Sequence, residues 1–330
     1  MEMEMEMRAM EDIELGQDIT QTLAPLTFSL HNSHIHTHCS ACFSLLSSTS
    51  VSNLNLNPNP LSPFYCSPPC SAAHSSLHIS SAERHLPPSA DSCDLRAALR
   101  LLSNHRPAAS GRVAGLLSNR QELTCQNPSH DDDTVLEVFE KIRVGASAMA
   151  AAIAKQRGCK NDDAVLEEAT VALCAVLTNA VEVQDNEGRT LGIAVFDTTF
   201  SWINHSCSPN ACYRFTLSSS SSSSPSEKHK LLIGPFTRHS QQPLIDSGVC
   251  GSSSSELAKE GELGYGPRLI VRSIKRIKRG EEVTVAYTDL LQPKALRQLE
   301  LWSKYRFICY CKRCSPLHFT YVDRALQVRL

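Results

Sequence analysis

The sequence predicts an α+β fold, with helices before residue 180, short strands after it and two groups of metal-binding cysteines. Three observations carry this prediction. Apolar residues recur at helical spacing between residues 135 and 177, short apolar runs broken by turn residues follow, and eight of the 14 cysteines stand in tight groups. A chain of 330 residues is long enough for one large domain, or two ordinary ones, with a buried core.

Two long helices are expected between residues 131 and 180. The first has an acidic start at residues 131–134, and Lys155, Arg157 and Gly158 are its stop signals. The second begins at residues 162–163. Its apolar face is formed by Val165, Leu166, Ala169, Leu173, Val176 and Leu177.

After Ala180 the pattern changes to short strands. Residues 181–184 and 191–196 flank an Asn186-Glu187-Gly188 turn, which predicts a hairpin. Pro293 is expected to be the first residue of a helix that ends near Lys304. The other expected strands are residues 231–236, 269–274 and 283–287, and the flexible Ser-rich insertions are residues 218–226 and 237–266.

The overall charge argues against one class of partner. A formal net charge of -2 and a pI near 6.7 indicate no basic surface for direct nucleic-acid binding.

No run reaches the roughly 18 apolar residues that cross a bilayer, and the segment from Met1 to Met7 lacks the regions of a secretory signal. We therefore expect a chain without a membrane partner, located in the nucleus, the cytoplasm or both.

Cysteines in the nucleus and the cytoplasm rarely form disulfides, because these compartments are reducing. Closely spaced cysteines in such a chain therefore indicate metal binding. Cys309, Cys311 and Cys314 crowd three thiols into six residues, and zinc holds such thiolates tetrahedrally. A closed structural site needs a fourth ligand. Cys207 is the best candidate, because it lies in the dense polar motif Asn204-His-Ser-Cys-Ser-Pro-Asn210.

A further tetrahedral site is predicted from two cysteine pairs near the N-terminus, Cys39 with Cys42 and Cys66 with Cys70. The long loop between the pairs is rich in Asn and Pro, which is typical of a module with too little core to fold without metal. A disulfide between these cysteines would need an extracellular chain, for which the sequence offers no support.

Other histidines and cysteines are expected to have ordinary roles. His74 and His78 follow at helical spacing and could add ligands, but their His- and Ser-rich surroundings favour a surface position. The six scattered cysteines are expected to be small buried hydrophobes. They are Cys93, Cys125, Cys159, Cys174, Cys212 and Cys250.

Three motifs in this order resemble the SET domain. They are the heptapeptide 204–210, the segment Gly280-Glu-Glu-Val-Thr-Val-Ala-Tyr287 and Cys309-x-Cys-x-x-Cys314. The chain as a whole resembles the SET-and-MYND (SMYD) family, in a plant SET-domain-group form. The resemblance implies a SET-type β-clip core with a helical SET-I insertion, a small MYND-like zinc module and a cysteine-rich post-SET zinc segment.

The same resemblance divides the chain into five parts. Many relatives continue into a helical repeat domain, so a chain that stops at Leu330 is expected to leave its substrate groove more open. In order, the parts are the N-terminal part of a split SET domain (1–38), a degenerate MYND-like zinc finger (39–92), the helical SET-I region (93–180), the catalytic SET half with Ser-rich insertions (181–292), and the post-SET zinc segment with a truncated C-terminus (293–330).

The resemblance also implies a reaction, the transfer of a methyl group from S-adenosyl-L-methionine to a lysine of a histone or another protein. A neutral amine attacks the sulfonium methyl in line, so the enzyme must mainly position the two reactants. Tyr287 resembles the catalytic tyrosine that orients the amine. The cofactor-binding positions match Asn204, His205, Asn179 and Phe307, and the lysine channel matches Tyr305 and Phe307.

These residues also have structural alternatives. His205 could be an ordinary core histidine and Tyr287 an ordinary strand aromatic, although the surrounding motifs favour the functional roles. Tyr305 and Phe307 could equally well only pack beside the zinc.

Two departures from the family bear on the cofactor and the metal. Family members open with a Gly-x-Gly turn that lets the backbone approach the cofactor. Here Glu4 and Glu6 occupy those positions, where two carboxylates would crowd the site and alter its charge. The family's finger has four ligand pairs for two zinc ions, of which the first and third are present. We therefore expect one zinc in this module, and two structural zinc sites in the chain.

Two functions of different class follow. The first is an active protein-lysine N-methyltransferase, favoured by the Tyr287 motif. The second is a zinc-binding adaptor that has lost cofactor affinity and binds Pro-rich peptides through its finger, favoured by Glu4, Glu6 and the missing C-terminal domain. A monomer is expected in either case.

Overall fold

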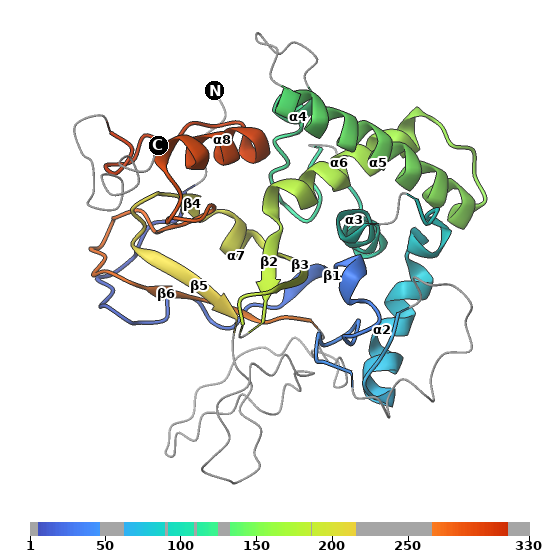
Figure 1. The fold of residues 1–330 in the computed structure, drawn as a ribbon, viewed down its shortest axis with the longest axis horizontal. Helices are drawn as coiled ribbons and strands as arrows, with labels where there is room; N and C mark the ends of the chain where they lie inside the picture. Colours follow the sequence, from blue (N-terminus) through green and yellow to red (C-terminus); the bar gives the residue numbers. More distant parts are fainter. Residues whose placement is uncertain are drawn as a thin grey trace, which may run out of the picture.

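The chain places its long helices and its strands on different sides of the molecule (Figure 1). The helices between residues 93 and 179 form one side, the strands lie beside them, and a helix over residues 294–305 covers the end of the strand region that is near the C-terminus. The computed structural model describes residues 6–46, 63–89, 92–108, 111–124, 133–185, 187–215 and 266–315.

The helical side is held by caps and a shared core. The two predicted long helices are confirmed as α5 (Asp133–Arg157) and α6 (Asp163–Asn179), and they pack with α3 (Cys93–Asn104) against the sheet. Ser92 caps α3 and Asp162 caps α6, each by accepting a backbone N–H of the first turn. The short helix α4 (Arg120–Thr124) lies beside α5 and α6.

A three-stranded antiparallel sheet has the order β1-β3-β2. Its predicted hairpin is confirmed as β2 (Val181–Gln184) and β3 (Thr190–Phe196). The third strand, β1 (Pro25–Leu30), was not predicted, because its apolar run is short and contains hydroxyl side chains that are nevertheless buried. A Cβ atom at Gly192 would lie 2.2 Å from the Ser29 carbonyl oxygen, so only glycine lets β3 approach β1 so closely.

Two smaller strand pairs complete the strand side. β4 (Asn204–His205) runs parallel to β7 (Thr284–Val285), and β5 (Ala211–Phe215) is antiparallel to β6 (Leu269–Ser273). The expected strand at 283–287 is thus shorter than predicted. The expected strand at 231–236 and the Ser run 218–226 lie outside the described residues.

The beginning of the chain runs along its later strands. Backbone bridges join Arg8 to Glu282, Ile13 to Ile277 and Leu23 to Leu269. Segments separated by more than two hundred residues in sequence therefore share one core, in which Ala9, Phe28 and Val285 are buried together.

The segment after β1 contains helices that the sequence analysis missed. They are η1 (Asn32–His34), α2 (Pro68–Ser80) and η2 (Ala82–His85). The expectation that His74 lies at the surface is wrong: its side chain is only 1% exposed, and its Nδ1 lies 3.0 Å from the Tyr65 hydroxyl. One face of α2 packs on Tyr65 and Phe28, which buries this histidine.

A buried ion pair ties this segment to α3. Arg100 donates from Nε to Oε2 of Glu83 over 2.6 Å and from Nη1 to the Phe28 carbonyl over 2.7 Å, and His78 also contacts the Glu83 carboxylate. Burial alone would raise the pKa of Glu83, but Arg100 and His78 together lower it to about 2. Glu83 is therefore ionised at neutral pH and links η2, α2 and α3.

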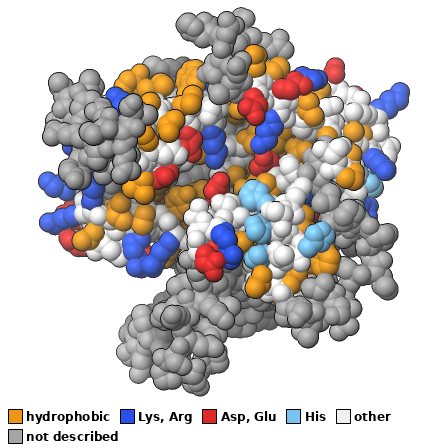
Figure 2. Space-filling view, in the orientation of Figure 1, with side chains coloured by type: hydrophobic (Ala, Val, Ile, Leu, Met, Phe, Trp, Pro, Cys, Tyr) orange, Lys and Arg blue, Asp and Glu red, His pale blue; other side chains and the backbone are white. Residues whose placement is uncertain are grey.

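The C-terminal helix is α8 (Lys294–Tyr305), and the short α7 (Thr198–Ser201) precedes β4. Pro293 precedes α8 as its N-cap residue and is not its first residue, a shift of one position from the prediction. Exposed apolar side chains gather over α8 and the segments beside it (Figure 2), among them Leu296, Leu299 and Trp302. No helix among the described residues is both long and apolar enough to span a bilayer.

The scattered cysteines only partly follow the prediction. Cys93 and Cys174 are buried as expected. Cys159 is exposed, because it directly follows the exposed end of α5, and Cys212 is only partly buried. Cys125 and Cys250 lie outside the described residues.

Candidate functional site

Two clusters of four cysteines are present, and we number them in chain order. The first cluster is Cys39, Cys42, Cys66 and Cys70, and the second is Cys207, Cys309, Cys311 and Cys314. Within each cluster all four sulfur atoms lie within 4.8 Å of one another. A tetrahedron with Zn–S bonds of about 2.3 Å has sulfur–sulfur edges of about 3.8 Å, so each cluster has the size to hold one zinc ion.

The second cluster confirms the predicted long-range grouping. Cys207 comes from the turn after β4, and the other three cysteines follow α8. Arg306, in a left-handed conformation with φ of 60°, ends α8 and turns the chain towards Cys207. The cluster thereby pins the 204–210 motif to the C-terminal segment.

The first cluster closes around the start of α2. Ser67 caps this helix by accepting the N–H of Cys70, which sets Cys70 close to Cys66, with their sulfur atoms 3.6 Å apart. Cys66 and Cys42 have sulfur atoms 3.5 Å apart. Neither His74 nor His78 belongs to the metal-binding groups found among the described residues.

The 204–210 motif is locked against β7. His205 pairs with Val285 across the parallel strands, and the backbone N–H of Tyr287 donates to Nδ1 of His205 over 2.9 Å. Asn210 holds the other side, because it donates to the Glu282 carbonyl and accepts the N–H of Thr284, each over 2.8 Å. The backbone thus fixes both His205 and Tyr287.

Four rings form a continuous aromatic group at this point. The ring centroid of Tyr287 lies 5.4 Å from that of His205 and 4.9 Å from that of Tyr305. Phe307 closes the group, 6.0 Å from His205 and 6.1 Å from Tyr305. The Tyr287 hydroxyl donates to the Ile203 carbonyl over 2.6 Å, so one lone pair of its oxygen remains for a ligand.

The two predicted asparagines are held near this group by different contacts. Asn204 donates to Oε1 of Glu282 over 2.8 Å. Asn179, the last residue of α6, donates to the carbonyls of Leu117 and Ala175. The loop that follows Leu117 reaches the aromatic group, because Asn119 donates to the Tyr305 carbonyl. The cofactor role of each asparagine remains a prediction.

Burial sets the protonation of the site. It lowers the pKa of His205 to about 4, so the imidazole is neutral at pH 7. Because Nδ1 accepts the Tyr287 N–H, the proton of the neutral ring is on Nε2, which lies 3.2 Å from the Cys207 sulfur. Burial raises the pKa of the Tyr287 and Tyr305 phenols, so both remain protonated.

At one of the two N-terminal glycine positions, the glutamate has an ion-pair partner. The Glu6 carboxylate accepts from Nε of Arg8 over 2.7 Å in an exposed pair, which offsets its charge. Arg8 also donates to the Gly280 carbonyl. Glu4 lies outside the described residues.

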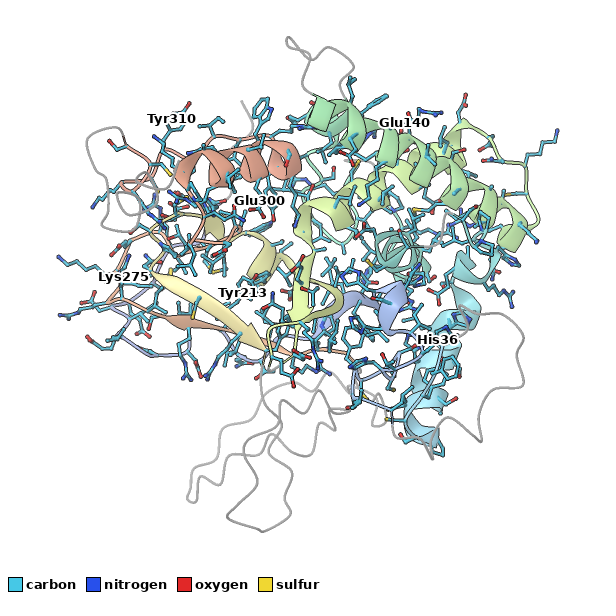
Figure 3. All side chains as sticks on the ribbon, in the orientation of Figure 1. His36, Glu140, Tyr213, Lys275, Glu300 and Tyr310 are labelled. Atoms are coloured by element: carbon cyan, nitrogen blue, oxygen red, sulfur yellow. The ribbon has the colours of Figure 1, made fainter. Side chains whose placement is uncertain are left out.

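The structure adds three residues that the sequence analysis did not single out. Tyr213 on β5 has its pKa raised to about 12 by burial and by nearby Tyr305 and Glu182. Lys304 has its ammonium 5.1 Å from the Tyr305 ring centroid, and burial lowers its pKa. Figure 3 labels Tyr213 on β5.

The third added residue is Arg297, which is fully buried beside the second cluster. A pattern in the sequence could have indicated it. Arg297, Leu301 and Tyr305 are spaced four residues apart and are the buried residues of α8.

Comparison with known proteins agrees with this geometry. The SET domain family matches residues 7–288. Protein SET DOMAIN GROUP 41 of Arabidopsis thaliana is 43% identical over 98% of the chain and 52% of its own length, so the chain spans about half of that relative. The fission yeast SET domain and MYND-type zinc finger protein 6 is 24% identical over 44% of the chain and 20% of its own length.

A mouse histone-lysine N-methyltransferase, SMYD3, is 40% identical over 15% of the chain and 12% of its own length. The family match spans most of the chain and contains the 204–210 motif, Tyr287 and the first cysteine cluster. The two four-cysteine clusters correspond to MYND-like and post-SET zinc sites. The chain therefore belongs to the SET domain family and has the mixed α/β fold of that family.

Proposed function

We propose that the chain is a protein-lysine N-methyltransferase that uses S-adenosylmethionine. The observation that carries this proposal is the convergence of His205 with Tyr287 and Phe307, which lie more than eighty residues later in the sequence, beside the second cluster. Membership of the SET domain family supports the same class of reaction.

The residues present suit the cofactor. The faces of His205 and Phe307 offer aromatic contact for an adenine ring, and aromatic rings also attract a sulfonium cation. Glu6 stands where the family has the second glycine of its turn, and Arg8 balances the charge of its carboxylate. When bound, S-adenosylmethionine supplies an electrophilic methyl group, and the protein only has to hold it in line with the amine.

On the lysine side, Tyr287 orients the amine and does not deprotonate it. Its raised pKa excludes a phenolate at neutral pH, and its hydroxyl proton is already donated to Ile203. The remaining lone pair can accept one N–H of a neutral target amine and so direct the nitrogen lone pair. Tyr305 and Phe307 form the walls around that amine.

The cofactor claim is tested by calorimetric and thermal-shift titration with S-adenosylmethionine. A ligand at one hundred times its dissociation constant should stabilise the folded chain by about 2.7 kcal/mol. No shift of the unfolding temperature at saturating cofactor would reject the methyltransferase proposal and favour the zinc-binding adaptor. A radiolabelled methyl-transfer assay on histones and on a lysate then identifies the protein substrate.

We also propose the finer partners that the sequence suggests. Relatives named histone-lysine N-methyltransferase support a lysine-bearing protein substrate. The module at 39–92 is proposed to bind a Pro-rich peptide, and the chain is proposed to be monomeric and to act in the nucleus, the cytoplasm or both. Peptide titration of the wild-type chain and light scattering test the first two statements, and imaging of a tagged chain tests the third.

A further inference from the structure

Arg297 places its guanidinium directly against the second cluster. Its Nε lies 3.4 Å from the sulfur of Cys207, and its Nη2 lies 4.0 Å from the sulfur of Cys314. Its third nitrogen, Nη1, donates to the Gln292 carbonyl over 2.6 Å, which fixes the plane of the group. The side chain is 0% exposed, so this cation is withdrawn from water.

Zinc held by four thiolates explains why a cation is buried there. Four thiolates and one Zn²⁺ carry a net charge of about −2. Burying such a charge is costly unless opposite charge and hydrogen-bond donors compensate it. A guanidinium offers both, because its N–H groups form charge-assisted bonds in a fixed fork.

Cys207 receives a second donor from the site itself. The proton on Nε2 of His205 faces its sulfur, because Nδ1 of the same ring accepts the Tyr287 N–H. Cys207 therefore lies between Arg297 and His205. Donors of this kind draw charge from a thiolate and lower its reactivity towards electrophiles.

We propose that Arg297 is the built-in counter-cation of the second cluster, a positioning residue that sets how tightly its cysteines hold zinc and how slowly they react. This inference rests on zinc occupying that cluster, for which its four converging thiols are suited. It adds a role for a residue outside the four ligands.

The test uses the full chain with Arg297→Met and Arg297→Lys, after its zinc content has been measured. Competition with a chromogenic chelator should show the affinity of the second cluster for zinc reduced roughly 10- to 100-fold in Arg297→Met. Arg297→Lys keeps the charge but loses the fork, so its loss should be smaller. Arg96→Met, which removes a buried arginine that donates to the Leu30 carbonyl of β1, is the control for general damage.

Cobalt substitution separates a role in tuning the sulfurs from a role in packing. The sulfur-to-cobalt charge-transfer band of the second cluster should move to lower energy in Arg297→Met, while the tetrahedral ligand-field bands keep their position. If that variant does not fold, Arg297→Lys carries the same comparison. An unchanged band together with zinc affinity within twofold of the wild type overturns the inference. A wild-type chain that binds zinc only at the first cluster overturns it together with the assignment of a zinc site to the second cluster.

Discussion

The first and second cysteine clusters each consist of four cysteines, but their sulfur atoms have different neighbours. The sulfurs of the first cluster contact the uncharged hydroxyls of Ser44 and Ser67. The sulfurs of the second cluster contact Arg297 and His205, and His205 accepts the backbone N–H of Tyr287. The first cluster therefore braces a small module, whereas the second is joined to the candidate active site. Four predictions, from the largest expected effect to the smallest, test this difference and the packing of the segment that holds the first cluster.

Cys207→Ser should remove one of two zinc ions and abolish measurable cofactor binding, because the 204–210 motif loses its anchor to the C-terminal segment. Cys70→Ser is the matched variant in the first cluster and should also lose one zinc, but keep cofactor binding. Elemental analysis and calorimetry measure the two quantities. Equal loss of cofactor binding in both variants would remove the functional distinction between the clusters.

Tyr287→Phe should lower the rate of methyl transfer roughly 100-fold or more, because the oxygen that orients the amine is lost. Zinc content and cofactor affinity should stay near the wild-type values. Tyr310→Phe is the control, since Tyr310 lies beside the second cluster but is 87% exposed. A Tyr287→Phe variant with full activity would show that another group orients the amine.

Glu83→Gln should cost about 3–5 kcal/mol of unfolding free energy, because Arg100 is left buried without its carboxylate. The folded-state pKa of about 2 lies below the unfolded value of about 4.3, so the pair stabilises the chain above about pH 5 and loses this effect as the pH falls towards 2. Urea unfolding at pH 7 and at acid pH should show the difference between variant and wild type shrinking with acid. The exposed Glu140→Gln, whose partner is Arg143, should leave stability nearly unchanged, because exposed ion pairs contribute little.

Tyr65→Phe should cost about 1–3 kcal/mol, because His74 loses its hydrogen-bond partner in a buried place beside the first cluster. Methyl transfer should be unchanged, in contrast to the effect of Tyr287→Phe. Thermal unfolding and the transfer assay measure the two effects on one preparation. A loss of transfer that exceeds the loss of folded protein would connect the first cluster to the reaction.

The elements that the sequence predicted well carry local signals. α5 and α6 have helical spacing and charged ends, and the hairpin β2-β3 has a turn between two apolar runs. The second cluster was predicted by counting, because three thiolates and one zinc require a fourth ligand.

The elements that were missed depend on contacts from elsewhere in the chain. β1 and β5 are short strands whose polar residues are buried or bonded by distant partners, such as the Thr27 hydroxyl with the Ala97 carbonyl. His74 is buried only because α2 packs on Phe28 and Tyr65. Arg297 was missed because a charged residue on a helix is expected at the surface unless its partners are known.

The most direct test of the coupling between the second cluster and the active site is the rate of zinc release to a chelator, with and without S-adenosylmethionine. Coupling between binding free energies is reciprocal, so a cofactor whose binding needs the second cluster must also raise the affinity of that cluster for zinc. We expect this tighter binding to appear as slower zinc release. We predict two phases of release from the wild-type chain. The cofactor should slow only the phase that Cys70→Ser retains and Cys207→Ser removes. Two release phases whose rates are both unchanged by the cofactor would contradict the coupling between the second cluster and the active site.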